Sequence, residues 1–234
     1  MHIRGEFMKV QFKRNIHLFI LLFIIHIVYA ATGLFLRDHG LSLNLKWLYW
    51  NLILAVIPLL ISIVIYLWVR WRKKWDILSL CAALVWLVFL PNACYMVTDL
   101  IHLQGSSLIG GNGIYLQSMH GWIRLIFTTA GIFLALVDGL FSTSLIHQNV
   151  KSRKNPVFNW IWMITVSLLV GYGVYIGRFL RLNTWDILHL RSLLKILLTN
   201  IDQFTILFSF MLAAFYFIAY LIFDRIMRSE IHTK

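Results

Sequence analysis

Four polar side chains recur at helical spacing in the first half of the chain. Intervals of three, four and three residues separate Asn92, Tyr95, Asp99 and His102. Because residues three or four apart share a face of an α-helix, the sequence predicts one polar stripe that starts beside Pro91. A carboxylate and an imidazole on neighbouring turns can exchange protons with a bound molecule, so Asp99 and His102 are candidate catalytic residues.

A second polar segment, residues 177–186, carries two cations. Arg178 and Arg181 are three residues apart, and polar or aromatic residues follow them directly. Arginine side chains bind carboxylates and phosphates through charge-assisted hydrogen bonds, so this segment predicts an ion pair with the first one or an anion-binding role. The candidate binding residues of the two segments together are Asn92, Tyr95, Thr98, Asp99, Arg178, Arg181, Asn183, Trp185 and Asp186.

The same segments contain two Asp-x-x-His pairs, Asp99 with His102 and Asp186 with His189. Carboxylates and imidazoles are ligands of divalent metals, which makes these four side chains candidate metal ligands. However, His189 lies at the flank of its predicted helix rather than beside Asp186. The stronger interpretation is an ionic and hydrogen-bonded cluster in which the two aspartates meet the two arginines.

Composition places these residues in a membrane. Hydrophobic residues make up 60% of the chain and charged residues 13%, whereas a soluble domain is about half apolar and about a quarter charged. A membrane-spanning helix needs about 20 mostly apolar residues, and six stretches qualify: residues 16–36, 47–69, 77–97, 122–145, 159–180 and 201–224. No long polar segment remains. We therefore predict an all-α, polytopic membrane bundle that forms a single domain, residues 1–234.

Basic residues predict the orientation of the bundle. The N-terminus, the second connection, the fourth connection and the C-terminus hold four, four, three and three Lys or Arg residues, which is 14 of the 21 in the chain. Lys and Arg stay preferentially on the cytoplasmic side. Both termini are therefore predicted to be cytoplasmic, and both polar segments to lie at the outer surface. We expect the first apolar run, which continues to Leu36, to be a retained span rather than a cleaved signal peptide.

The charge distribution also indicates the partners. The net charge of +12 comes mostly from basic residues scattered over short connections. Such residues contact anionic lipid headgroups, whereas a nucleic-acid-binding protein gathers them on one folded face. We expect membrane lipids, and not nucleic acid, as partners.

Residues 185–199, between the fifth and sixth spans, are predicted to form a helix that lies at the outer membrane surface. Asp186, Leu190 and Leu193 share one face of that helix, and Arg191 and Lys195 lie roughly opposite. This arrangement turns Asp186 toward the protein, which favours a paired role for its carboxylate.

Other residues inside the spans have mainly structural interpretations. Ionisable side chains within a membrane are candidate functional groups. We nevertheless expect His26 to be a neutral imidazole hydrogen bonded to a neighbouring helix, and Asp138 to be held in an ion pair or hydrogen bond. The alternative for Asp138 is a proton-relay group of a transporter. Gly173 and Gly177, four residues apart, predict a close helix–helix approach.

The two polar segments carry a resemblance to a known family. The first reads Leu-Pro-Asn-Ala-x-Tyr-x-x-Thr-Asp-Leu over residues 90–100, and the second reads Gly-Arg-Phe-x-Arg-x-Asn-x-Trp-Asp over residues 177–186. With these signatures the chain resembles an uncharacterised bacterial membrane-protein family, domain of unknown function 1361. The resemblance covers most of the chain from the second span onward. It implies a multi-pass protein of the bacterial plasma membrane and supplies no activity, cofactor or catalytic residue.

The leading functional hypothesis is recognition or processing of an anionic lipid or envelope precursor at the outer leaflet. The alternatives are a small-solute or ion transporter and a non-catalytic assembly partner. The sequence has no serine-nucleophile elbow, His-Glu-x-x-His zinc helix or phosphate-binding loop. It therefore leaves open whether the protein is an enzyme, which cofactor it uses, and whether the polar cluster is a cavity or a closed ion-pair network.

Overall fold

The computed structural model describes residues 2–41, 45–103, 108, 114, 116–150, 155–181 and 201–232. Within these ranges the chain is helical and contains no strand. The elements in chain order are α1 (His2–Asp38), α2 (Leu45–Arg72), α3 (Ile77–Phe89), α4 (Pro91–Tyr95), the 3₁₀-helix η1 (Met96–Leu103), α5 (Met119–Val150), α6 (Pro156–Tyr175), the π-helix η2 (Ile176–Leu180) and α8 (Gln203–His232).

Six helical segments of the described chain are long and apolar enough to cross a membrane, which confirms the predicted architecture. They are Val10–Asp38, Lys46–Arg72, Ile77–Leu103, Met119–Val150, Pro156–Leu180 and Gln203–Met227. Most extend beyond the predicted boundaries because hydropathy marks the hydrocarbon layer, whereas a helix can continue into the headgroup region. The predicted interfacial helix, residues 185–199, lies outside the described residues.

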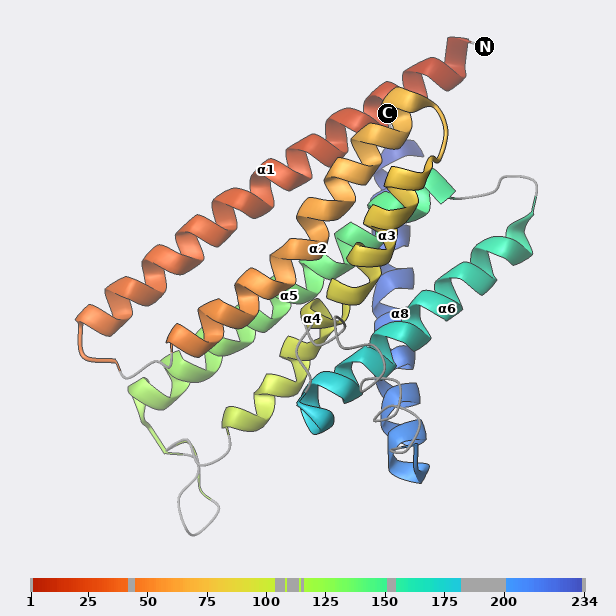
Figure 1. The fold of residues 1–234 in the computed structure, drawn as a ribbon. Coiled ribbons are helices and arrows are strands. Elements are labelled where there is room, and N and C mark those ends of the chain that lie inside the picture. The colour runs from red at the N-terminus through yellow and green to blue at the C-terminus, as the bar shows by residue number, and fades with distance from the viewer. Residues whose placement is uncertain are drawn as a thin grey trace.

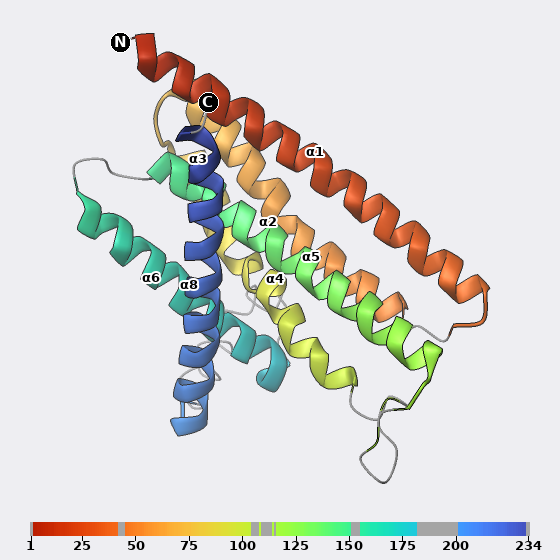
Figure 2. The same ribbon diagram turned by 180° about the vertical axis from the view of Figure 1, so that it is seen from behind.

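The spans alternate in direction, so both termini lie on the same side of the bundle (Figure 1). We call this the N/C side. The end of α1, the start of α2, the end of η1 and the start of α5 lie on the other side, which we call the opposite side. The view from behind in Figure 2 shows the same arrangement.

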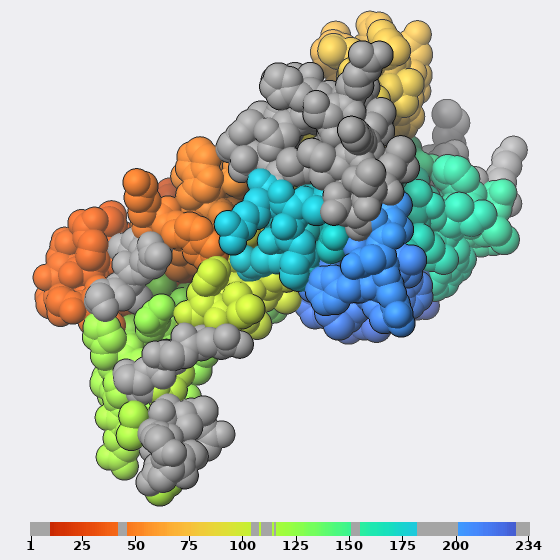
Figure 3. Space-filling model, turned by 60° about the horizontal axis from the view of Figure 1, so that its bottom comes forward, coloured from red at the N-terminus to blue at the C-terminus, as the bar shows by residue number. Residues whose placement is uncertain are grey.

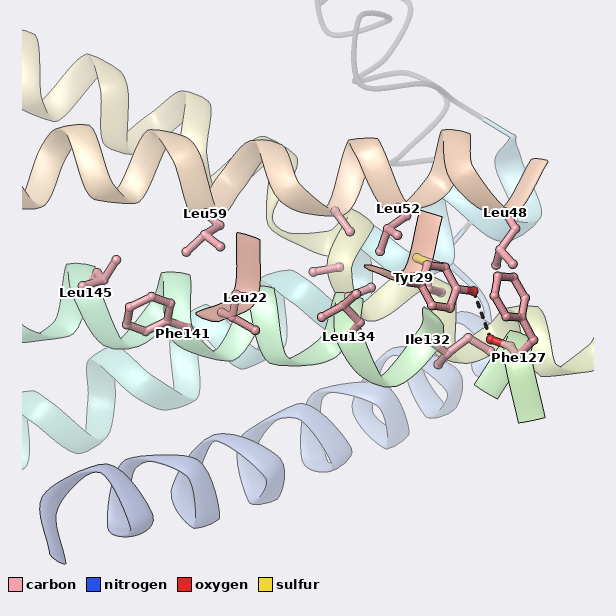
Figure 4. Packing of buried hydrophobic residues seen from close by; sticks show 14 of the residues in the cluster. Leu22, Tyr29, Leu48, Leu52, Leu59, Phe127, Ile132, Leu134, Phe141 and Leu145 are labelled. Atoms are coloured by element: carbon pink, nitrogen blue, oxygen red, sulfur yellow. Dashed lines mark hydrogen bonds between the residues drawn. The ribbon is translucent and has the colours of Figure 1, made fainter. Parts of the chain in front are cut away.

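Two apolar cores hold the helices together. One lies between α1, α2 and α5 and includes Leu22, Leu52 and Phe141 (Figure 4). The other lies between α2, α3, α5, α6 and α8 and includes Trp86 and Tyr216. Since α2 and α5 contribute to both cores, they form the centre of the bundle.

Helix α1 lies along one edge of the bundle in both ribbon views. Of its most apolar stretch, 17% is buried against protein, compared with 56% for α5. Most of the surface of α1 is therefore apolar and available to lipid. Its Tyr29 hydroxyl donates a hydrogen bond to the carbonyl of Phe127 at 3.0 Å (Figure 4).

Glycines in the fifth span permit the close approach that the sequence predicted. A Cβ atom on Gly173 would lie 2.3 Å from Cγ of Pro91, and one on Gly177 would lie 3.4 Å from the Tyr95 ring. The first distance is a severe clash, whereas the second is ordinary contact. Helix α4 therefore packs directly against the backbone of α6 at Gly173.

This packing predicts different effects for two glycine substitutions. Gly173→Ala should lower the melting temperature of the detergent-purified protein by about 5 °C, because the new methyl group overpacks the contact with Pro91 at a cost of about 1–3 kcal/mol. Gly177→Ala is the matched control and should change it by less than about 2 °C, because its methyl group has room. Equal melting temperatures for the two variants would contradict the packing of α4 on α6.

Candidate functional site

The third span does not reach the opposite side as one α-helix. Helix α3 ends at Phe89, α4 begins at Pro91, and the chain then winds as the 3₁₀-helix η1. A 3₁₀-helix has three residues per turn, so residues three apart eclipse one another. Met96, Asp99 and His102 consequently share one face of η1. The prediction of a single α-helical stripe from Asn92 to His102 was therefore wrong in its geometry.

Asp99 is fully buried and is held through both carboxylate oxygens. Its Oδ1 atom accepts a hydrogen bond from the Arg178 guanidinium at 2.5 Å, and its Oδ2 atom accepts one from the Asn51 amide at 2.9 Å. Arginine keeps its charge in proteins, and an amide NH₂ group can only donate. The arrangement is that of an ionised carboxylate, and the pair formed by Asp99 and Arg178 is electrically neutral.

Arg178 is fixed by two further contacts with the end of the third span. Its Nε atom donates a hydrogen bond to Thr98 Oγ1 at 2.9 Å, and its guanidinium lies 4.6 Å from the centre of the Tyr95 ring. The Thr98 hydroxyl in turn donates to the carbonyl of Tyr95 at 2.6 Å. Arg178 of the second polar segment is therefore held by three residues of the first, Tyr95, Thr98 and Asp99.

The arginine is carried by an unusual turn. The fifth span ends as the five-residue π-helix η2, and Arg181 closes it with a left-handed φ of 54°. A π-turn is wider than an α-turn and frequently marks a functional site. The side chain of Arg181 is exposed, so of the two arginines it is Arg178 that reaches Asp99. Seen from the opposite side, η2 (cyan) lies against η1 (yellow-green) in Figure 3.

A pocket of about 280 Å³ lies beside Asp99, on the part of the bundle formed by α2, η1 and α5. Its lining residues are Trp47, Leu48, Asp99, His102, Leu103, Arg124 and Thr128. The candidate residues predicted from the sequence do not include Trp47, Asn51, Arg124 or Thr128. Asn51 and Arg124 could have been noticed because each is a polar or charged residue inside an otherwise apolar span.

His102 lies at the pocket without joining Asp99. Its ring meets the ring of Trp47 edge to face, with 4.4 Å between the ring centres. Its backbone carbonyl accepts a hydrogen bond from Arg124 at 3.4 Å. In the described part of the chain no hydrogen bond joins Asp99 to the His102 imidazole, although both residues line the pocket, so their catalytic role stays a prediction.

Several predicted site residues are not part of this geometry. Asn183, Trp185, Asp186 and His189 lie outside the described residues, so their predicted roles in binding and metal ligation stay predictions. Among the residues that the structure describes, no three His, Cys, Asp or Glu side chains gather as a metal-binding group. Asn92 donates its amide to the carbonyl of Phe89 at 2.9 Å.

Comparison with known proteins identifies a family and no activity. The family model described as "Protein of unknown function (DUF1361)" matches residues 50–220. The match includes α3, α5 and α6 entirely and begins after α1. No curated protein and no solved structure matches the chain.

The contact between Asp99 and Arg178 predicts strong energetic coupling. In a double-mutant cycle with Asp99→Asn and Arg178→Gln, the coupling free energy should be about 2 kcal/mol, because each single change leaves a buried charge or donor without its partner. The measurement is the free energy of unfolding of the four detergent-purified proteins.

The exposed pair of Arg37 and Asp38, whose charged atoms lie 3.1 Å apart on the same side of the bundle, is the matched control. Its coupling should be below about 1 kcal/mol, because water screens exposed charges. A coupling for Asp99 and Arg178 that is no larger than this control would contradict a buried ion pair.

Proposed function

The chain belongs to the DUF1361 family of membrane proteins, and since that family is one of unknown function we propose an activity from the site alone: binding of an anionic lipid or lipid-linked envelope precursor. The ligand's charged headgroup would occupy the pocket between α2, η1 and α5. The observation that carries this proposal is the position of Arg124 in the wall of that pocket, next to a neutral ion pair.

The existence of the pocket favours binding over a purely structural network. A closed network would use every charged group of the cluster to join one helix to another. Here Arg178 forms an ion pair with Asp99, yet a pocket of about 280 Å³ remains beside that carboxylate. Protein pockets for small molecules or headgroups have volumes of this order.

The charge of the pocket favours an anion. Asp99 is balanced by Arg178, so Arg124 gives the lining a net positive charge. Among the described residues, the guanidinium of Arg124 makes one hydrogen bond, the long 3.4 Å contact with the carbonyl of His102. Most of its donors are therefore available to a phosphate or carboxylate, which guanidinium groups bind with two parallel hydrogen bonds.

The depth of the pocket favours a headgroup. It is bounded by the first residues of the second span, at Trp47, and by the last residue of the third, Leu103. Tryptophan is common at this level because its ring is apolar and its N–H is polar. On the positive-inside argument, this level is the outer leaflet of the bacterial plasma membrane.

A transporter is the second candidate, because His26 and Asp138 lie deeper in the membrane. On α5, ten residues separate Thr128 of the pocket from Asp138, which is about 15 Å along a helix. The buried residues over this stretch are apolar, among them Ile132 and Leu134 (Figure 4). This layer argues against a continuous polar path and favours binding at the surface.

The binding test compares two arginines on the same side of the bundle. The purified protein should bind short-chain phosphatidylglycerol more tightly than phosphatidylcholine, as measured by titration in a neutral detergent. Arg124→Gln should weaken phosphatidylglycerol binding about 10-fold, because a charge-assisted hydrogen bond contributes about 1.5–3 kcal/mol. Arg37→Gln, which removes an exposed charge away from the pocket, should leave binding unchanged.

Two outcomes would contradict the proposal. Equal affinity for the two lipids would show that the pocket does not select an anionic headgroup. An equal loss of binding in the two variants would show that general surface charge, rather than Arg124, attracts the lipid.

A further inference from the structure

His26 and Asp138 meet inside the membrane, away from the pocket. The Nε2 atom of His26, on α1, lies 3.0 Å from Oδ2 of Asp138, on α5. Asp138 is fully buried, and neither of its oxygens has an aligned hydrogen bond in the described part of the chain. The contact with His26 therefore has the distance of an ion pair without the alignment of a hydrogen bond, and it is the carboxylate's available source of charge compensation.

The other imidazole nitrogen determines how many protons the pair holds. Nδ1 of His26 lies 2.8 Å from the backbone carbonyl of Leu22, one turn earlier in the same helix. A carbonyl oxygen can only accept, so Nδ1 must carry a hydrogen. Two bare lone pairs 3.0 Å apart would repel, so one further proton must lie on either Nε2 or Oδ2.

Each location of that proton gives a pair with no net charge. On Nε2 it makes an imidazolium beside a carboxylate, and on Oδ2 it makes a neutral imidazole beside a carboxylic acid. Removing the proton would leave a net negative charge, and adding a second would leave a net positive one. Either charge costs several kcal/mol in the interior of a membrane.

We propose that His26 and Asp138 together bind a single proton in the membrane interior, and that this proton attaches α1 to the rest of the bundle. Helix α1 needs such an attachment because little of its surface is buried. It also lies before the residues that match the family, so Asp138 belongs to the matched region and its partner does not.

Other attachments of α1 lie on either side of His26 along the helix. The Asn15 amide donates to the Tyr66 hydroxyl at 3.0 Å and to the Gln148 side chain at 2.9 Å. The Tyr29 hydroxyl donates to Phe127, as described above. The His26–Asp138 pair lies between these contacts, and unlike them it joins two titratable side chains through a shared proton.

Neighbouring titratable groups do not compensate the pair. Those that are buried on the surrounding elements α1, α2, α4, α5, η1 and α8 are Tyr29, Tyr66, Cys94, Asp99, His147, Tyr216 and Tyr220. Asp99 is balanced by Arg178. His147 is hydrogen bonded to Tyr220 at 2.8 Å, nine residues or about 14 Å along α5 from Asp138. Tyrosine and cysteine are neutral in water near pH 7.

The test is the pH dependence of thermal unfolding of the full-length protein in detergent, between about pH 5 and about pH 8. In the His26→Leu variant the Asp138 carboxyl group has lost its partner, so it must itself bind a proton to stay buried. The folded state then binds more protons than the unfolded state, so stability rises as pH falls. We expect a melting temperature about 10 °C below wild type at the upper pH, with the difference shrinking toward the lower pH.

Two matched variants isolate the proton from simple packing. His26→Leu combined with Asp138→Asn has no stranded carboxyl, so the extra pH dependence should disappear. Asp138→Asn alone keeps a neutral pair, because the asparagine amide can donate to Nε2, and should melt within about 3 °C of wild type. Hydrogen exchange should report faster exchange of α1 in His26→Leu than in wild type at the upper pH, with α6 and α8 unchanged.

The proposal is overturned if His26→Leu and the double variant show the same pH dependence, or if Asp138→Asn is as unstable as His26→Leu. Should His26→Leu fail to accumulate, His26→Gln replaces it, since glutamine cannot carry the charge. Accumulation of the double variant when both single His26 variants are absent would support a stranded carboxylate as the cause. Absence of the double variant as well would show that attachment of α1 does not depend on the proton, and would overturn the proposal.

Discussion

The carboxylate of Asp99 imposes the main constraint on the structure. It is fully buried near the end of a membrane span, where an uncompensated charge costs several kcal/mol. Arg178 supplies the compensation, and the two residues meet because neither lies on a regular α-helix. The third span is overwound into η1 and the fifth is underwound into η2. One ion pair therefore depends on two departures from ideal winding.

Close packing of α4 against α6 positions the Asp99–Arg178 ion pair. Gly173 admits Pro91, which places the start of α4 against the backbone of α6, and Gly177 admits the Tyr95 ring one turn further on. The Tyr95 ring then lies under the guanidinium of Arg178. The other side of Asp99 borders the pocket that contains Arg124. Asp99 thus separates a tightly packed helix contact from an open, positively charged space.

Much of this could be predicted from the sequence. Hydropathy located the six spans, and glycine spacing indicated the close approach at Gly173. Opposite charges at the same membrane level indicated that Asp99 and Arg178 could meet. The 3₁₀ and π windings could not be predicted, because they depend on contacts between distant segments rather than on local propensity. The roles of Asn51 and Arg124 could not be predicted for the same reason. A lone polar residue in an apolar span indicates that its side chain needs a partner, but the sequence does not show which residue that partner is.

The separation of His26 and Asp138 along the chain has a consequence for synthesis. The first span enters the membrane before α5 exists, so His26 must remain in lipid without its partner. It can do so, because a neutral imidazole satisfies one nitrogen on the carbonyl of Leu22 within its own helix. A lone aspartate is harder to accommodate in this way. The residue that lipid tolerates better, His26, is therefore synthesised and inserted first. When the carboxyl group of Asp138 enters the membrane, its partner is already present there.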